Sequence, residues 1–293
     1  MNQWQKILAD SISDPADLPR RFRLERQALR EVADIYPMRI NPYYLGLIES
    51  PDDPLGRQAI PDLRELADRV CPADPLGEEN LSPVPNLVHK YPDRALLLVN
   101  SGCAMYCRFC TRKRKVGTDR FHIDPVTLAA GLDYLERTPA IRDVLVSGGD
   151  PLLLEDDRLE WLLTRLRRIP SVEIIRIGTR VPCTLPMRVT APLARMLKKF
   201  HPLYINTHFN HPAEITPAAA RACGRLADAG IPLGCQTVLL KGVNNDAGVI
   251  RKLLHRLLMV RVKPYYIFQG DLSRGTDHFR TPVREGLAIM EQL

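Results

Sequence analysis

Three cysteines, Cys103, Cys107 and Cys110, follow one another in the order Cys-x3-Cys-x2-Cys. Cysteine thiolates at short spacings hold zinc or iron–sulfur clusters. A closed zinc site normally takes four ligands, but no fourth Cys or His precedes the triplet nearby, and His122 follows it without a paired ligand. Three thiolates suit a four-iron cluster that leaves one iron open to a small molecule. The spacing therefore favours an iron–sulfur site over structural zinc.

The other four cysteines, Cys71, Cys183, Cys223 and Cys235, show no partner spacing, and we expect them to be buried apolar residues. An odd total of 7 cysteines does not suit a disulfide framework. The opening MNQWQK does not read as a signal peptide, and no apolar run approaches the roughly 18 residues of a membrane span. We therefore expect a cytoplasmic protein without a membrane anchor.

The net charge of +7 is modest for 293 residues, and the basic residues are scattered apart from one run at 112–115. A run of four cations is more often a solvated face than a nucleic-acid footprint. Charge therefore does not favour nucleic acid as a partner. It leaves one non-catalytic alternative, a cluster-containing or zinc-containing binding protein whose basic run meets RNA.

The elements that must position these residues divide the chain into two parts. Apolar residues make up 45% and charged residues 26%, which excludes disorder, collagen and coiled coil as overall descriptions. Residues 1–90 predict a helical layer, with helical patterns at 4–11, 18–33 and 60–69 interrupted by Pro and Asp. Residues 91–293 change to short apolar runs that alternate with amphipathic helices.

The second part predicts six βα units. Strands are expected at 95–99, 143–147, 173–178, 203–207, 232–240 and 262–268. Helices are expected at 125–137, 158–168, 192–200, 217–229 and 246–258. Repeated βα units give parallel strands, in an open sheet or a full or partial barrel. We predict an α/β protein with a partial (βα)6 TIM-like barrel behind an N-terminal helical layer.

Polar residues follow five of the expected strands. They comprise Asn100 with the cysteines, then residues 148–150, 179–180, 208–211 and 269–271. In a parallel barrel the carboxyl ends of the strands share one rim, so these residues would converge on one mouth. The sequence therefore predicts a common active site at that rim.

The motifs at these positions resemble a known family. Residues 103–112, CAMYCRFCTR, look like the signature of the radical S-adenosylmethionine (SAM) superfamily. A set of further segments resembles the lysine 2,3-aminomutase family: HKYPDR at 89–94, SGGDP at 147–151, TRVP at 179–182, NTHFNHP at 206–212, YYIFQGDLS at 265–273 and HFRTP at 278–282. The likeness runs from about residue 36 to the last residue, with the motifs in order.

The resemblance implies a [4Fe-4S] cluster held by Cys103, Cys107 and Cys110, with SAM on the open iron. It implies that Gly148 and Gly149 let the backbone approach the methionine end of SAM, since glycine is needed where a side chain would block approach. It places Asp150 near the amino group of SAM. His208 and Gln236 match positions that contact its nucleoside part.

The same resemblance implies pyridoxal phosphate (PLP) as a third cofactor. Tyr91 and Arg94 match positions beside its phosphate, and Lys90 stands there as a point charge rather than a bidentate fork. Arg112 matches the residue that clamps the substrate carboxylate, a task that suits a guanidinium. Asp271 matches one of two aspartates that bind the distal ammonium of lysine.

The sequence departs from the family pattern at the lysine that holds PLP. No Gly-Gly-Gly-Gly-Lys stretch occurs, and the second aspartate is also missing. Lys241 and Lys263 are the lysines nearest to late strand ends, but we expect them to be surface or loop residues. Because the chain stops inside a predicted amphipathic helix at 284–293, we expect it to be truncated before the PLP lysine.

The implied activity is the isomerisation of L-lysine to L-β-lysine by 1,2-amino migration, driven by an electron from a donor such as flavodoxin or ferredoxin. A second possibility is a related enzyme that makes β-lysine for attachment to elongation factor P. Glutamate 2,3-aminomutase is a third, and it is opposed by Asp271 because a carboxylate there would repel the glutamate side chain. The sequence is compatible with a homo-oligomer.

Overall fold

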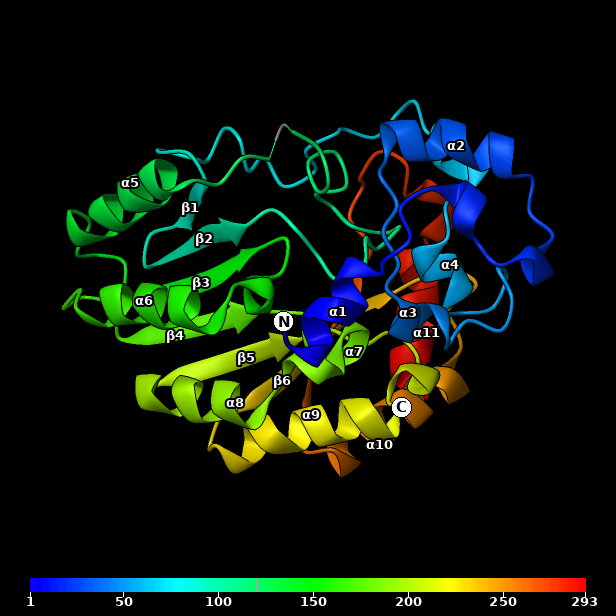
Figure 1. The fold of residues 1–293 in the computed structure, drawn as a ribbon. Helices are drawn as coiled ribbons and strands as arrows, with labels where there is room; N and C mark the ends of the chain where they lie inside the picture. Colours follow the sequence, from blue (N-terminus) through cyan, green and yellow to red (C-terminus); the bar gives the residue numbers. More distant parts are fainter. Residues whose placement is uncertain (120) are drawn as a thin grey trace.

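The computed structural model describes residues 1–119 and 121–293, and its centre is a curved, open sheet (Figure 1). Within these residues the sheet has seven strands in the order of the sequence. The first pair, β1 and β2, is antiparallel and all later pairs are parallel. The strands are β1 (Leu87–Tyr91), β2 (Arg94–Asn100), β3 (Asp143–Gly148), β4 (Ile174–Gly178), β5 (Leu203–Thr207), β6 (Leu233–Leu239) and β7 (Lys263–Gln269). The predicted α/β partial barrel is confirmed.

The helices that follow the strands cover the outer face of the sheet (Figure 1). They are α5 (Pro125–Glu136), α6 (Asp156–Arg167), α8 (Ala191–Leu197), α9 (Pro217–Asp228) and α10 (Ala247–Met259). Two further helices, α7 (Val181–Thr184) and α11 (Val283–Glu291), lie on the side of the carboxyl strand ends, next to the N-terminal helices (Figure 1). Side-chain oxygens of Asp124, Thr190, Thr216 and Asp246 accept from backbone N–H groups in the first turns of α5, α8, α9 and α10. These N-caps satisfy donors that a helix start leaves unpaired.

The two faces of the strands differ in a way that leaves the barrel hollow. Outward residues such as Val146, Ile177 and Ile205 are fully buried and belong to the main hydrophobic core beneath the helices. Several inward positions carry polar side chains or none, as at Asn206 and Gly234, and these line cavities. The two cavities leave room for ligands inside this barrel, whereas a closed TIM barrel has a packed centre.

The N-terminal layer lies beside the carboxyl ends of the strands (Figure 1). It contains α1 (Gln3–Ala9), α2 (Arg26–Ile35), α3 (Pro42–Leu45), α4 (Gly56–Ala59) and a 3-10 helix at Leu63–Leu66. The helix predicted at 60–69 is therefore wrong in length. The side chain of Asp62 caps this turn and Glu65 bonds back to the Asp62 N–H at 2.9 Å, but the turn ends at Ala67.

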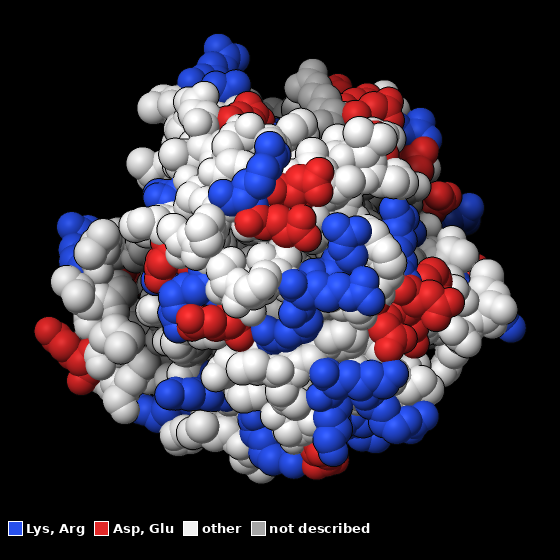
Figure 2. Space-filling view, turned by 90° about the vertical axis from the view of Figure 1, so that its left-hand side faces the viewer, with Lys and Arg blue, Asp and Glu red and all other residues white. Residues whose placement is uncertain are grey.

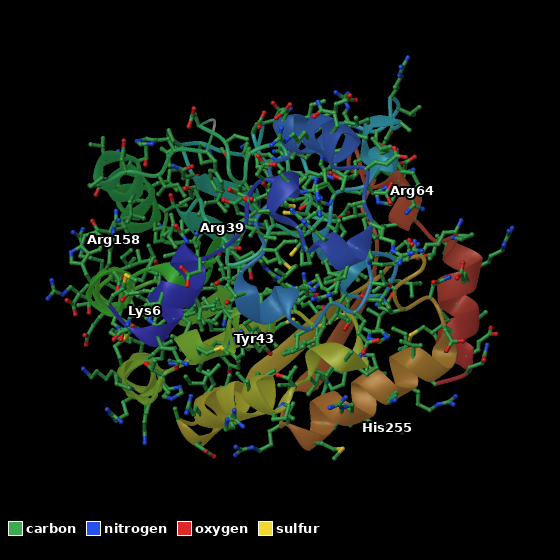
Figure 3. The ribbon with its side chains drawn as sticks, turned by 45° about the vertical axis from the view of Figure 1, so that its right-hand side comes forward. Lys6, Arg39, Tyr43, Arg64, Arg158 and His255 are labelled. Carbon is green, nitrogen blue, oxygen red and sulfur yellow. The ribbon has the colours of Figure 1, made fainter. Side chains whose placement is uncertain are left out.

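Residues of the layer and the barrel share one core, so the proposed boundary at residue 90 does not separate two cores. It falls inside β1, a strand that the sequence did not predict because Leu87–Tyr91 offers just two buried residues. Arg39 donates to the Leu8 carbonyl at 3.1 Å and the Tyr43 hydroxyl lies 2.7 Å from that of Thr216. Figure 3 labels both side chains between the N-terminal helices and the barrel.

No helix in residues 1–119 or 121–293 is long and apolar enough to cross a membrane. This agrees with the absence of long apolar runs in the sequence.

A buried carboxylate, Glu65, links the N-terminal layer to residues 108–113, which include the last cysteine of the motif. Its oxygens accept from Arg108 at 2.6 and 2.9 Å and from Lys113 at 2.7 Å, and all three side chains are at most 5% exposed. Burial raises the pKa of Glu65, but the two cations outweigh burial and hold that pKa below its usual range. The carboxylate therefore stays ionised and anchors the cysteine segment at Arg108 and just beyond it at Lys113.

We expect Glu65→Gln to lower the free energy of unfolding by about 3 kcal/mol, because it leaves two buried cations without their counter-charge. Urea denaturation measures the change. The matched control is Glu160→Gln, which removes an exposed partner of Lys199 and should cost less than about 1 kcal/mol. Equal losses in the two variants would show that Glu65 is not a structural anchor.

Candidate active site

A cavity of about 520 Å³ lies at the carboxyl ends of the strands, in the size range of small-molecule sites. Cys103, Cys107 and Cys110 all line it. The other predicted site residues that line it are Gly148, Gly149, Asp150, His208, Gln236, Arg112 and Asp271. The structure therefore brings together ten of the thirteen site residues that the sequence predicted, as the shared rim of a parallel barrel requires.

Gly148 and Gly149 hold the backbone of the cysteine loop at close range. Gly148 has φ +132°, a conformation that favours glycine, and a Cβ there would lie 2.4 Å from the Asn100 oxygen. A Cβ on Gly149 would lie 2.3 Å from the Gly102 oxygen. The N–H of Gly149 donates to Asn100 at 2.5 Å and that of Asp150 donates to Gly102 at 2.8 Å. The glycines thus have a structural task that the sequence analysis did not assign to them.

Asp150 is buried and its carboxylate is already hydrogen-bonded. It accepts from the Thr179 hydroxyl at 2.6 Å and from the backbone N–H groups of Arg180 at 2.8 Å and Leu152 at 3.1 Å. Burial raises the pKa of Asp150 to about 6, against these hydrogen bonds. Its side chain joins the loop after β3 to the loop after β4 at the wall of the cavity.

The pKa values of the Cys103 and Cys110 thiols are raised, so a nearby positive charge would be needed to favour their thiolate forms. Burial raises the pKa of Cys103 well above its usual value, and Asp150 and Cys110 raise it further. Burial and Cys107 likewise raise the pKa of Cys110. Metal binding reverses this cost, because metal-bound thiols lose their protons. No three His, Cys, Asp or Glu side chains in the described ranges are grouped to hold a single metal ion, and the three thiols instead line the wall of the larger cavity.

Arg180 points its guanidinium at one of these thiols. Its Nη1 donates to the Cys107 Sγ at 2.8 Å, and its Nη2 donates to Glu214 at 2.7 Å and to Gln58 at 2.6 Å. The sequence analysis quoted Arg180 within a motif but gave it no role, and it missed Glu214. No sequence signal pointed to Glu214, because it lies 34 residues from Arg180 and is brought in from another loop.

His208 and Arg180 both contact the ring of Phe109. The His208 ring stacks on Phe109, with centroids 5.4 Å apart, and Arg180 lies 5.1 Å from the Phe109 centroid. Burial, helped by Arg180, lowers the pKa of His208 to about 3, so the imidazole is neutral at pH 7. Its Nε2 is buried and finds no hydrogen-bond partner among the described residues. A polar ligand in the cavity would satisfy this atom.

Arg112 is held by a buried carboxylate, Glu78. Its Nε and Nη2 donate to the Glu78 oxygens at 2.6 to 3.0 Å, and its Nη1 donates to the Gly148 oxygen at 3.3 Å. The Glu78 side chain is 5% exposed. The predicted carboxylate clamp therefore already binds a carboxylate of this chain.

The same acidic loop pairs with the rest of the basic run. Arg114 lies 3.0 Å from Asp74, and Arg114 and Lys115 lie 3.4 and 3.0 Å from Glu79. Lys113 pairs with Glu65 in the N-terminal layer. Every cation of the run thus has a partner within the chain, which removes the basis for an RNA-binding face. A complementary signal, three acidic residues within 74–79, was visible in the sequence but was not used.

Lys90, Tyr91 and Arg94 lie outside this cavity, on the β1–β2 hairpin. Tyr91 is 53% exposed, and the Arg94 guanidinium lies 5.3 Å from its ring centroid. Lys90 acts on Asp271 at the cavity rim, where it opposes the rise in the pKa of Asp271 that burial causes. The three residues lie together on the hairpin, and none of them lines the 520 Å³ cavity.

A second cavity of about 420 Å³ lies at the amino ends of the strands. Ile174, Leu233 and Lys263 begin β4, β6 and β7 and help to line it, together with Arg176, Tyr204 and Tyr265. Asn206 borders both cavities, so they follow one another through the barrel. Figure 2 views the molecule from this end and shows Lys and Arg gathered over its middle and lower part. Lys241 and Lys263 are both exposed, as expected, and Lys263 also borders this cavity.

Comparisons with known proteins agree with this geometry. Residues 97–254, which include the three cysteines, match the Radical SAM superfamily. An L-lysine 2,3-aminomutase from Acetoanaerobium sticklandii is 49% identical over 100% of this chain and 72% of the relative, and one from Fusobacterium nucleatum is 48% identical over 100% and 70%. The chain belongs to the lysine 2,3-aminomutase family. A glutamate 2,3-aminomutase from Clostridioides difficile is also 47% identical, over 99% of this chain and 69% of the relative.

Membership of the lysine 2,3-aminomutase family makes the chain an enzyme of the isomerase class and implies the use of SAM and a [4Fe-4S] cluster. The side chains and backbone groups that line the 520 Å³ cavity suit SAM and a [4Fe-4S] cluster. The cavity combines three thiols with two glycine backbones and an unsatisfied imidazole nitrogen. Family membership alone does not separate a lysine from a glutamate substrate, because relatives with both names match over the full barrel.

We expect Gly149→Ala to displace the cysteine loop, because the added methyl group would clash with the Gly102 carbonyl. Iron content after anaerobic reconstitution should fall severalfold, and the free energy of unfolding should fall by about 1 to 3 kcal/mol. The matched control is Gly224→Ala in α9, where the nearest atom is the flexible end of Arg261 at 3.4 Å. That control should keep full iron content, and an equal iron content in Gly149→Ala would contradict the structural task of Gly149.

Proposed function

We propose that this enzyme interconverts L-lysine and L-β-lysine by 1,2-amino migration. The observation that carries this choice is the pairing of charges along one cavity, with the Arg112 guanidinium and the Asp271 carboxylate both in its lining. An α-amino acid with a distal ammonium offers one group to each. The side-chain carboxylate of glutamate would instead meet Asp271, a like charge, at the cavity rim.

Cys103, Cys107 and Cys110 are proposed to hold the [4Fe-4S] cluster, with Gly148, Gly149 and Asp150 beside the methionine part of SAM. The close packing of the glycines on residues 100–102 supports this, since it fixes the cysteine loop against the loop after β3. His208 and Gln236 are proposed to contact the nucleoside. The buried and unpartnered Nε2 of His208 supports that assignment.

PLP is the third proposed cofactor. The second cavity, at the amino ends of the strands, offers positive charges for its phosphate. Arg176 and Lys263 line that cavity, and Arg176 is braced by an ion pair with Asp143. Arg94 and Arg176 both act on the pKa of Tyr266, although a hydrogen bond to Tyr265 raises that pKa overall. Arg94 is thus within electrostatic range of Tyr266 on β7. This supports the proposal that Lys90, Tyr91 and Arg94 lie next to the second cavity.

When bound, the reduced cluster and SAM supply a carbon radical that removes hydrogen from the substrate, and PLP supplies electron delocalisation during the migration. The residues of the chain orient the substrate and exclude water. Arg112 fixes the carboxylate end and Asp271 the distal ammonium. The electron comes from a low-potential donor such as flavodoxin or ferredoxin.

The wild-type chain should bind iron and sulfide after anaerobic reconstitution and form β-lysine when L-lysine, SAM, PLP and reductant are supplied. We expect Cys107→Ala to lose both the cluster and the turnover, because a four-iron cluster needs each of the three thiolates. The matched control is Cys223→Ala, a buried cysteine of α9 outside the cavity, which should keep the cluster. Metal analysis that finds one zinc and no labile sulfide in the wild type would favour a zinc protein instead.

We expect Asp271→Asn to raise the KM for L-lysine about tenfold or more, with a smaller effect on kcat, because the lost charge contributes to binding of the distal ammonium. Steady-state turnover measures both constants. Asp228→Asn, at an exposed carboxylate paired with Arg261, serves as the control and should leave KM unchanged. Preference of the wild-type enzyme for L-glutamate would overturn the choice of substrate.

A further inference from the structure

Arg180 is a buried cation in direct contact with a cysteine of the cluster motif. Its side chain is 10% exposed, and its Nη1 lies 2.8 Å from the Cys107 Sγ. The contact joins the loop after β4 to the cysteine loop, 73 residues apart in the chain. Because the Arg180 side chain is largely enclosed, its N–H donor holds a fixed position on the sulfur, unlike a donor at the protein surface.

Further hydrogen bonds fix the guanidinium of Arg180. Glu214, which is fully buried, accepts from Arg180 at 2.7 Å and from the Tyr44 hydroxyl at 2.9 Å. Its other oxygen accepts from the backbone N–H groups of Asn210 at 2.7 Å and His211 at 3.1 Å. These bonds fix the Glu214 carboxylate, which in turn holds the opposite edge of Arg180 in place.

The arrangement therefore puts a positive donor on the cysteine and a negative charge behind it. In iron–sulfur proteins the reduction potential depends on net charge, solvent exposure and hydrogen bonds to the sulfurs. Reduction adds one electron and hence one negative charge to the cluster. A cation that donates to a cluster thiolate stabilises the reduced form more than the oxidised form.

We infer that Arg180 is a positioning residue that raises the reduction potential of the cluster through its hydrogen bond to the Cys107 thiolate, with Glu214 limiting that rise. This inference rests on the proposed cluster ligands, but not on the choice of lysine as substrate. The step concerned is the transfer of one electron from a low-potential one-electron donor, which takes the [4Fe-4S] cluster from the 2+ to the 1+ state. Arg180 keeps its proton throughout, so no proton is transferred in this step.

The test is a redox titration of the reconstituted full chain, followed by electron paramagnetic resonance of the reduced cluster before SAM is added. We expect Arg180→Lys to make the potential more negative, because one ammonium cannot serve both Cys107 and Glu214 in the geometry of the fork. At a fixed solution potential the ratio of reduced to oxidised cluster should fall about tenfold, or about 59 mV for one electron.

Glu214→Gln provides the opposite perturbation while keeping Arg180 and the cysteines. It removes the negative charge behind the guanidinium, so the potential should become less negative. Arg188→Lys is the matched control, since Arg188 is more deeply buried than Arg180 but donates to the carbonyls of Leu152 and Leu154 and not to a cysteine. Its potential should equal that of the wild type.

Opposite shifts in the two variants, with iron and sulfide contents equal to the wild type, would support the inference. An unchanged potential in Arg180→Lys with an intact cluster would overturn it. If Arg180→Lys assembles no cluster, Glu214→Gln decides, and a potential equal to the wild type would overturn the inference. Loss of the cluster in the wild-type chain itself would instead reject the proposed cluster ligands, a result that titration of the wild type reveals first.

Discussion

The site depends on one close backbone contact, that between residues 100–102 and Gly148–Gly149. The carboxyl ends of β2 and β3 are adjacent because the strands are parallel neighbours, but adjacency alone leaves the two loops free to diverge. Two short hydrogen bonds and the absence of both Cβ atoms bring the loop after β3 against the loop that leads to Cys103. The position of the cysteines is thus set by sheet geometry first and by glycine second, and the surrounding side chains act on a loop that is already fixed.

Buried charge is the second constraint, and the chain resolves it by supplying a carboxylate for each cation near the cysteines. Glu65 serves Arg108 and Lys113, Glu78 serves Arg112, and Glu214 serves Arg180. Each pair joins the cysteine segment or the loop after β4 to a different part of the chain. Removing one partner would leave an uncompensated buried charge, which is far more costly than losing an exposed pair. The N-terminal layer is therefore part of the site, since it supplies Glu65 and the loop that carries Glu78.

The sequence predicted the barrel well because β2 to β6 each have a buried outward face, and β5 was placed at its observed bounds of Leu203–Thr207. It missed β1, whose five residues become a strand by pairing with β2 and not by an apolar pattern of their own. Motifs pointed to ten of the residues that line the 520 Å³ cavity at the carboxyl ends of the strands. They could not identify Glu214, because it lies 34 residues from Arg180 and a single long-range ion pair leaves no local pattern. Glu78 is equally far from Arg112, and only the acidic cluster at 74–79 opposite the basic run pointed to it. Lys90, Tyr91 and Arg94 lie on one hairpin, and a motif alone did not indicate that they are absent from the lining of the 520 Å³ cavity.

The Arg112–Glu78 pair changes how substrate binding by this site must be understood. A guanidinium with 16% exposure cannot wait for substrate as a free cation without a large cost in solvation, and the bidentate contact with Glu78 removes that cost. A substrate carboxylate that binds Arg112 therefore exchanges with Glu78 or takes the Nη1 edge, which now faces the Gly148 carbonyl. In either case the net gain is the difference between two similar contacts, and affinity must come largely from the other end of the substrate. That requirement gives Asp271, at the exposed rim, more weight in selecting the ligand than its single charge suggests.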